Sequence, residues 1–281
     1  MSGTHGRGTA LSRPVTADPK RTIAGLVCVL TAVAASSFVF SAWAHSSLPV
    51  TRSYVSELEG AGQPYQVLFR LSDVLSGVGL IVLALLVLGR LTKGPCSLAG
   101  CALLAVAGVA SLCDAANPMS CIPSIDAACR AEQDTTSGLI RQVFEPHTTS
   151  SLVGFCATGG AMLLFGVAAA STDPIFSRLS VACAIVTGAL GIADVVLILT
   201  QSLVGLSERG RILVFSLWLL ALGARFLRPP TPVPSSDALR SRQPTATMHC
   251  VPAERPAPRT VEPPGPQEER QRYDGGVGAN E

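Results

Sequence analysis

The chain has 281 residues, of which 48% are hydrophobic and only 14% carry a charged side chain. Soluble domains carry charge on about 25% of their residues. This composition, with a mean hydropathy of +0.43, therefore indicates an all-α polytopic membrane protein. The net charge of +2 is too small to predict binding to nucleic acid, and no such partner is expected.

Apolar runs of membrane length follow one another along the chain, each close to the roughly 20 residues that a helix needs to cross a bilayer. They occupy residues 23–44, 65–88, 97–113, 148–170, 179–200 and 212–227. We therefore predict a bundle of six transmembrane helices within residues 22–228. The flanking segments, 1–21 and 229–281, are polar or rich in Pro, Arg and Glu, and we expect both to be disordered tails.

The first run allows a second interpretation, as a secretory signal peptide. Residues 42–44 read Ala-Trp-Ala, a small-x-small pattern that is typical of cleavage sites. The run has roughly 22 apolar residues, however, and a signal core usually has about 7–15. We favour a retained span, and cleavage remains the alternative.

The longest predicted connection, residues 112–147, joins the third and fourth runs and contains Cys121 and Cys129. Because the exterior of a bacterial cell permits disulfides, we expect a bond between these two cysteines. A shorter connection, residues 201–211, is predicted as a loop that contains Glu208, Arg209 and Arg211.

Basic residues near the ends of the runs predict the orientation of the protein. One side of the membrane receives Arg7, Arg13, Lys20, Arg21, Arg90, Lys93, Arg178, Arg225 and Arg228. The other side receives Arg52, Arg130, Arg141, Arg209 and Arg211, together with several acids. The excess of basic residues marks the cytoplasmic side. We therefore expect a multi-pass protein of the bacterial cell membrane with both termini in the cytoplasm.

Ionisable side chains in the runs gather toward the outer side of the membrane. Asp73 and Asp194 lie about 10 Å from the outer ends of their runs at 1.5 Å per residue, whereas Asp114 closes the third run and His147 opens the fourth. A charge at the bilayer centre costs at least about 2.5–3.5 kcal/mol, so these groups should face the interior of the bundle. The predicted outward-facing polar pocket consists of Asp73, Asp114, His147, Asp194, Glu57, Ser76 and Glu208.

Simpler explanations exist for some of these residues. Arg70 stands three residues before Asp73, which would allow an ion pair along one helix. Small and hydroxyl residues share faces of several runs, and such faces also serve as packing seams between membrane helices. His147 is equally compatible with an ordinary residue at the membrane surface.

No motif in the sequence specifies a reaction or a cofactor. A metal site needs three or more converging ligands, and Asp73, Asp114, His147 and Asp194 are the candidates, without an ordered spacing such as HExxH. A Ser-His-Asp set can be written from Ser56 or Ser72 with His147 and Asp114, but no G-x-S-x-G motif accompanies it.

Several short motifs resemble the bacterial domain of unknown function 998 family. They are the Ser-Glu-Leu and Gly-x-Pro before the second run, Asp114 and Pro118 after the third, and Glu208 and Arg209 before the sixth. The resemblance extends from about Thr22 to Arg228 and implies a six-helix integral membrane protein without an established activity. A weaker likeness to ceramidase-like membrane hydrolases fails on the histidines, because those enzymes hold zinc with several of them.

These observations favour a protein that contacts the lipid bilayer and binds or transports a small solute or lipid. A metal-dependent membrane hydrolase acting on a lipid or envelope substrate is the first alternative. A structural or partner-binding membrane scaffold is the second. The sequence leaves the choice among the three classes open.

Overall fold

The computed structural model describes residues 18–43, 47–88, 94–133, 135–199 and 203–228. Regular structure in these ranges is helical, without a strand. The helices are α1 (Pro19–Ala35), η1 (Ser37–Ala42), η2 (Ser56–Glu59), α2 (Gln66–Val87), α3 (Pro95–Ala116), α4 (Ala127–Gln133), α5 (Thr136–Val143), α6 (Pro146–Ala169), α7 (Pro174–Leu199) and α8 (Val204–Leu227). The predicted disordered tails lie outside the described residues, except that α1 begins at Pro19, within the first of them.

Six of these helices are long and apolar enough to cross a membrane, and they correspond to the six predicted runs: α1 continued by η1, α2, α3, α6, α7 and α8. The predicted all-α fold with six membrane spans is therefore confirmed. The helices extend beyond the apolar runs mainly at their beginnings. Pro19, Pro95, Pro146 and Pro174 each start one of them, because proline lacks the N–H that would be unpaired in a first turn.

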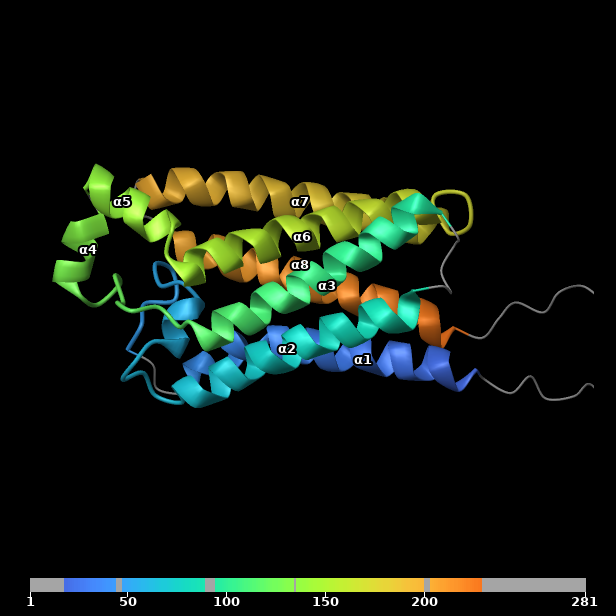
Figure 1. The fold of residues 1–281 in the computed structure, drawn as a ribbon, viewed down its shortest axis with the longest axis horizontal. Helices are drawn as coiled ribbons and strands as arrows, with labels where there is room; N and C mark the ends of the chain where they lie inside the picture. Colours follow the sequence, from blue (N-terminus) through green and yellow to red (C-terminus); the bar gives the residue numbers. More distant parts are fainter. Residues whose placement is uncertain (1–17, 44–46, 89–93, 134, 200–202, 229–281) are drawn as a thin grey trace, which may run out of the picture. The chain divides into compact units, whose positions relative to one another are not determined.

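The long helices form a closed ring, in which each packs against its neighbours along the chain. α1 packs against α2, α2 against α3, α3 against α6, α6 against α7, α7 against α8, and α8 returns to α1 (Figure 1). Arg21 donates hydrogen bonds to the carbonyl oxygens of Arg225 and Arg228, which joins the start of α1 to the end of α8. A ring of this kind encloses a central space that every span can line.

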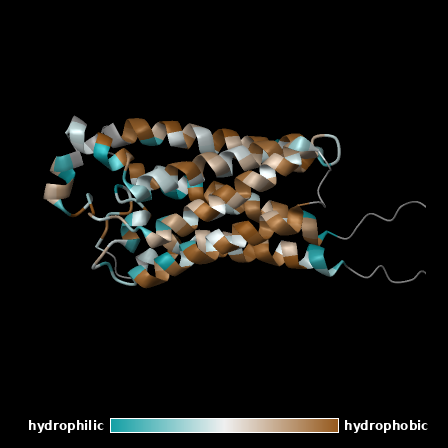
Figure 2. Ribbon diagram, in the orientation of Figure 1, coloured by the Kyte–Doolittle hydropathy of each residue, from teal (hydrophilic) through white to brown (hydrophobic). Residues whose placement is uncertain are grey.

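Part of this central space is filled by an apolar core. Trp218 and Leu222 of α8, Phe165 of α6, Leu104 of α3 and Leu83 of α2 are almost fully buried there. The long helices are apolar over most of their length, as the brown colour of their ribbons in Figure 2 shows. Large apolar side chains that remain exposed include Leu30, Leu85, Ile185, Ile192 and Leu217. An apolar exterior around a packed core suits a lipid environment.

Glycines allow the closest contact between helices α2 and α3. A Cβ atom on Gly77 would lie 2.6 Å from the carbonyl oxygen of Gly108, and one on Gly108 would lie 2.6 Å from that of Gly77. No other residue fits at either position without a shift of backbone. Small residues at helix crossings are the usual basis of packing between membrane helices.

Two connections differ from the sequence prediction. The predicted loop at 201–211 is wrong in its second part, since α8 begins at Val204 and carries Glu208, Arg209 and Arg211 in its first two turns. These charged residues lower the apolarity of the segment, but each has a partner in the fold. The long connection between the third and fourth spans contains two short helices, α4 and α5, at the end of the bundle where α3 ends and α6 begins (Figure 1).

Candidate functional site

The connection between α1 and α2 folds onto one end of the ring, and we call residues 47–65 the cap segment. Its helix η2 buries Glu57, Leu58 and Glu59. Leu58 belongs to a second apolar cluster, separate from the core between the helices, with Phe38, Leu48, Phe69 and Ile122. The cap segment is therefore packed into the end of the bundle and does not lie free on its surface.

Arg209 of α8 holds the cap segment in place. Its Nη1 donates to the carbonyl oxygens of Val50 at 2.9 Å, Ser53 at 2.7 Å and Gly205 at 2.9 Å, and the side chain is only 6% exposed. The N–H of Gly205 in turn donates to the carbonyl oxygen of Thr51 at 3.1 Å. A Cβ atom on Gly205 would lie 2.4 Å from the carbonyl oxygen of Ser53, so this close approach requires glycine.

Two further charged residues of α8 connect it to neighbouring elements. The carboxylate of Glu208 accepts a hydrogen bond of 2.6 Å from the N–H of Val55 in the cap segment. Arg211 forms an ion pair of 2.9 Å with Asp194 of α7, and its guanidinium lies 4.5 Å from the centre of the Phe155 ring. The ion pair and the aromatic ring both stabilise the positive charge of Arg211 at this depth.

Glu57 supports the cap segment from within. It is fully buried and accepts hydrogen bonds from the N–H of Tyr54 at 3.2 Å and from the hydroxyl of Ser124. Burial raises the pKa of Glu57, whereas these hydrogen bonds and the charge of Arg209 act in the opposite direction. Ser124 stands between Cys121 and Cys129, which the structure joins in the predicted disulfide. The disulfide loop therefore contacts the cap segment through this pair.

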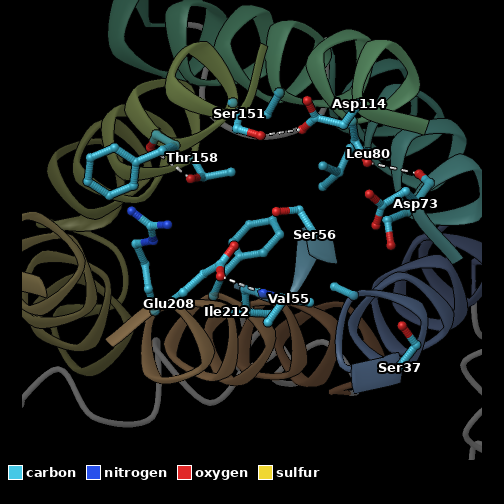
Figure 3. Close-up of a pocket in the computed structure, with 18 of the residues that line it drawn as sticks. Ser37, Val55, Ser56, Asp73, Leu80, Asp114, Ser151, Thr158, Glu208 and Ile212 are labelled. Carbon is cyan, nitrogen blue, oxygen red and sulfur yellow. Dashed lines mark hydrogen bonds between the residues drawn. The ribbon is translucent and has the colours of Figure 1, made fainter. Parts of the chain in front are cut away.

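Beneath the cap segment lies a cavity of about 190 Å³, which residues from all six spans line. Its polar lining residues are Ser37, Ser56, Glu59, Asp73, Ser76, Ser111, Asp114, His147, Ser151, Thr158, Thr187, Glu208 and Arg211. Figure 3 shows Asp73 and Asp114 on one side and Glu208 across from them, with Ser56 of the cap segment between. Apolar residues such as Leu80 and Ile212 complete the wall.

Asp114 and His147 form a polar group where α3 ends and α6 begins. Ser150 and Ser151 both donate hydrogen bonds to the carboxylate of Asp114, the second at 3.1 Å. His147 is buried, with Nδ1 3.1 Å from the carbonyl oxygen of Asn117 and 3.7 Å from Oδ1 of Asp114. A carbonyl oxygen only accepts, so Nδ1 carries a proton and Nε2 is left for another partner.

Asp73 is linked to the cap segment through a second carboxyl group. The carboxyl groups of Asp73 and Glu59 interact electrostatically. Burial and, after it, the negative charge of Asp73 raise the pKa of Glu59 to about 10. Arg70 donates its hydrogen bonds to the backbone oxygen of Glu59, at 3.1 and 3.0 Å, which places its guanidinium against the cap segment.

The residues predicted for the pocket thus fall into two groups. Asp73, Ser76, Asp114, His147 and Glu208 line the cavity. Asp194 stands behind Arg211 as its ion-pair partner, and Glu57 lies within the cap segment. Among the described residues there is no group of three or more His, Cys, Asp or Glu side chains placed to hold a metal ion.

Sequence reasoning missed three contributors to this site. Glu59 stands two residues from Glu57, but nothing in the pattern indicates which of the two faces the cavity. Arg211 and Arg209 were assigned to a loop. One signal was available: if the last helix is extended by two turns, Glu208 and Arg211 stand three residues apart on one of its faces.

The fold and the site together define an integral membrane protein of six helical spans with a polar cavity near one end. The family described as Protein of unknown function (DUF998) matches residues 26–225. The chain belongs to this family, as its motifs predicted. No match was found among curated proteins or among solved structures.

Proposed function

We propose that this protein binds a small polar solute or a lipid headgroup in the cavity beneath the cap segment, and that it transports this ligand across the membrane. The cavity itself carries the proposal, because polar groups from all six spans converge on one space of about 190 Å³. Polar side chains inside a membrane bundle cost stability. Their convergence on a cavity is therefore best understood as a binding site.

The binding proposal predicts that a ligand stabilises the purified protein. Within a panel of small polar solutes and lipids, one compound at about 100 times its Kd should add about 2.7 kcal/mol of stability. For a chain of this size, that raises the midpoint of thermal unfolding by roughly 5–10 °C. Uptake of the same compound into liposomes then separates transport from binding alone.

Two leucine substitutions provide matched variants for this experiment. Ser76→Leu adds bulk to the cavity wall and should abolish the thermal shift, whereas Gly188→Leu adds the same side chain where nothing lies within 4 Å and should keep it. The proposal fails if no compound stabilises the wild-type protein, or if the shift survives unchanged in Ser76→Leu.

We further propose that the capped end of the bundle faces the outside of a bacterial cell, with both termini in the cytoplasm. The support is the set of basic residues at the opposite end, among them Lys20, Arg21, Arg178, Arg225 and Arg228. Reporter fusions after Arg228 and after Thr135 should report opposite sides of the membrane, with the first in the cytoplasm. The same side for both would contradict the six-span arrangement.

Hydrolysis remains the second candidate because of one observation, the contact between Asp114 and His147. An acid beside Nδ1 of a histidine orients the ring as a general base. In the described part of the chain, however, no serine hydroxyl is hydrogen-bonded to Nε2, and Ser56 donates instead to the sulfur of Met119. The assay is release of product from lipid or ester substrates. Activity that is lost in His147→Phe and kept in Ser56→Ala would favour a water activated by the histidine.

A further inference from the structure

Among the described residues, three buried side chains that line the cavity have a polar atom without a hydrogen-bond partner, and Glu59, only 4% exposed, is one of them. Ser76 and His147 are each only 5% exposed and both line the cavity. The atoms concerned are Oε2 of Glu59, Oγ of Ser76 and Nε2 of His147. In the neutral ring Nε2 is an acceptor, because Nδ1 carries the proton toward Asn117. Buried polar atoms are normally paired, so these three point to a ligand.

The charge of the lining specifies which kind of ligand fits. Four carboxyl groups line the cavity, those of Glu59, Asp73, Asp114 and Glu208. Among the described lining residues, the only guanidinium or ammonium group is that of Arg211, and Asp194 already pairs with it at 2.9 Å. Within the described lining, no guanidinium or ammonium group forms an ion pair with the carboxyl groups of Asp73 and Asp114. A ligand that supplies positive charge would compensate them.

We propose that the ligand of this cavity carries a primary ammonium group, an inference that rests on the proposed binding function. Such a group has three N–H donors and one positive charge, and it meets both the unpaired Nε2 of His147 and the carboxylate of Asp114. These two residues lie together, with Nδ1 of the ring 3.7 Å from the carboxylate. The cavity of about 190 Å³ has room for about six water-sized groups.

A bare metal ion fits the lining less well. Such an ion needs several oxygen ligands at one point, and the described residues contain no group of three or more acids, histidines or cysteines so placed. An ammonium group requires only acceptors in its three directions. It can come from a free amine or from the headgroup of an ethanolamine lipid, and the chemistry at the protein is the same for both.

Matched solutes test the ammonium group directly. Ethanolamine, ethylene glycol, tetramethylammonium, acetate and sodium would each be titrated into the purified full-length protein, in a buffer free of amines and at constant ionic strength. We expect ethanolamine to bind at least tenfold more tightly than ethylene glycol, which lacks the charge, and than tetramethylammonium, which lacks the N–H donors. The inference would be overturned if ethylene glycol, tetramethylammonium, sodium or acetate bound as tightly as ethanolamine.

Variants then place the ammonium group in the cavity. Asp114→Asn should weaken ethanolamine binding at least tenfold, and His147→Phe, which removes Nε2, should weaken it as well. Glu132→Gln removes an exposed carboxyl group on α4 and should leave the affinity unchanged. Unchanged affinity in Asp114→Asn, in protein that elutes as a folded monodisperse species, would place the amine elsewhere and overturn the inference.

Nanodiscs separate the two sources of the ammonium group. Greater stability in phosphatidylethanolamine than in phosphatidylcholine, lost in Asp114→Asn, identifies the lipid headgroup, whereas ethanolamine binding with equal stability in both lipids identifies a free amine. Either result supports the inference. If an uncharged or anionic solute binds and Ser76→Leu abolishes its binding, the inference falls and the proposed function stands. If neither solute nor lipid binds, both fall.

Discussion

Replacing Arg209 with alanine should destabilise the protein by about 3–5 kcal/mol, the usual cost of removing one partner from a buried charged network. The carbonyl oxygens of Val50, Ser53 and Gly205 would each lose a donor inside the fold. Glu57 would also lose the compensating charge of Arg209. The midpoint of thermal unfolding in detergent should fall by roughly 6–20 °C.

Arg52 provides the control, because it lies in the cap segment and its side chain is exposed. Arg52→Ala should leave the midpoint nearly unchanged. Arg209→Lys should lie between the two, since lysine keeps the charge but cannot reproduce the planar arrangement of donors. A midpoint for Arg209→Ala within about 1 °C of the wild type would show that apolar packing alone holds the cap segment.

The stability of the protein should fall as pH rises from about 5 toward 9, and Glu59 should account for much of this slope. The pKa of Glu59 is raised from 4.5 to about 10 by burial and by the charge of Asp73, with Asp114 adding to the increase and Arg70 opposing it. A group whose pKa is higher in the folded state stabilises fully below the unfolded value. That stability is lost as pH rises toward the folded value.

One such proton changes stability by at most about 1.4 kcal/mol per pH unit. Glu59→Gln keeps the shape and a donor toward Asp73 but cannot ionise, so its thermal midpoint should depend less on pH and exceed that of the wild type near pH 8. The exposed Glu132→Gln serves as the control and should follow the wild-type slope. A wild-type midpoint that rises between pH 5 and 9 would contradict the assignment.

The number and positions of the spans could be predicted because membrane helices depend on local apolarity and length. The grouping of Asp73, Asp114 and His147 also followed from depth alone, since three helices that end or begin at one membrane surface bring such residues to one level. The beginning of α8 could not be found in this way. Its first two turns carry Glu208, Arg209 and Arg211, and the partners that make a helix favourable there come from distant segments.

The burial of the cap segment could not be predicted from the sequence either, because it too depends on partners in distant segments. Residues 47–65 contain no long apolar period, and their burial depends on Arg209, Ser124 and Ile122. Such contacts join residues far apart in the chain, so local composition describes the segment as a polar loop. The role of Glu59 in the cavity wall depends in turn on the position of this segment.

The bond between Arg209 and the carbonyl oxygen of Ser53 also bears on biosynthesis, because 156 residues separate the two positions. At about 5–20 residues per second, the donor leaves the ribosome roughly 10–30 s after the acceptor. Throughout that interval, Glu57 and the nearby carbonyl oxygens of the nascent chain lack Arg209, their final partner. Of the six described spans, the one furthest along the chain therefore closes the cavity, and a product truncated before α8 would expose this region to proteolytic quality control.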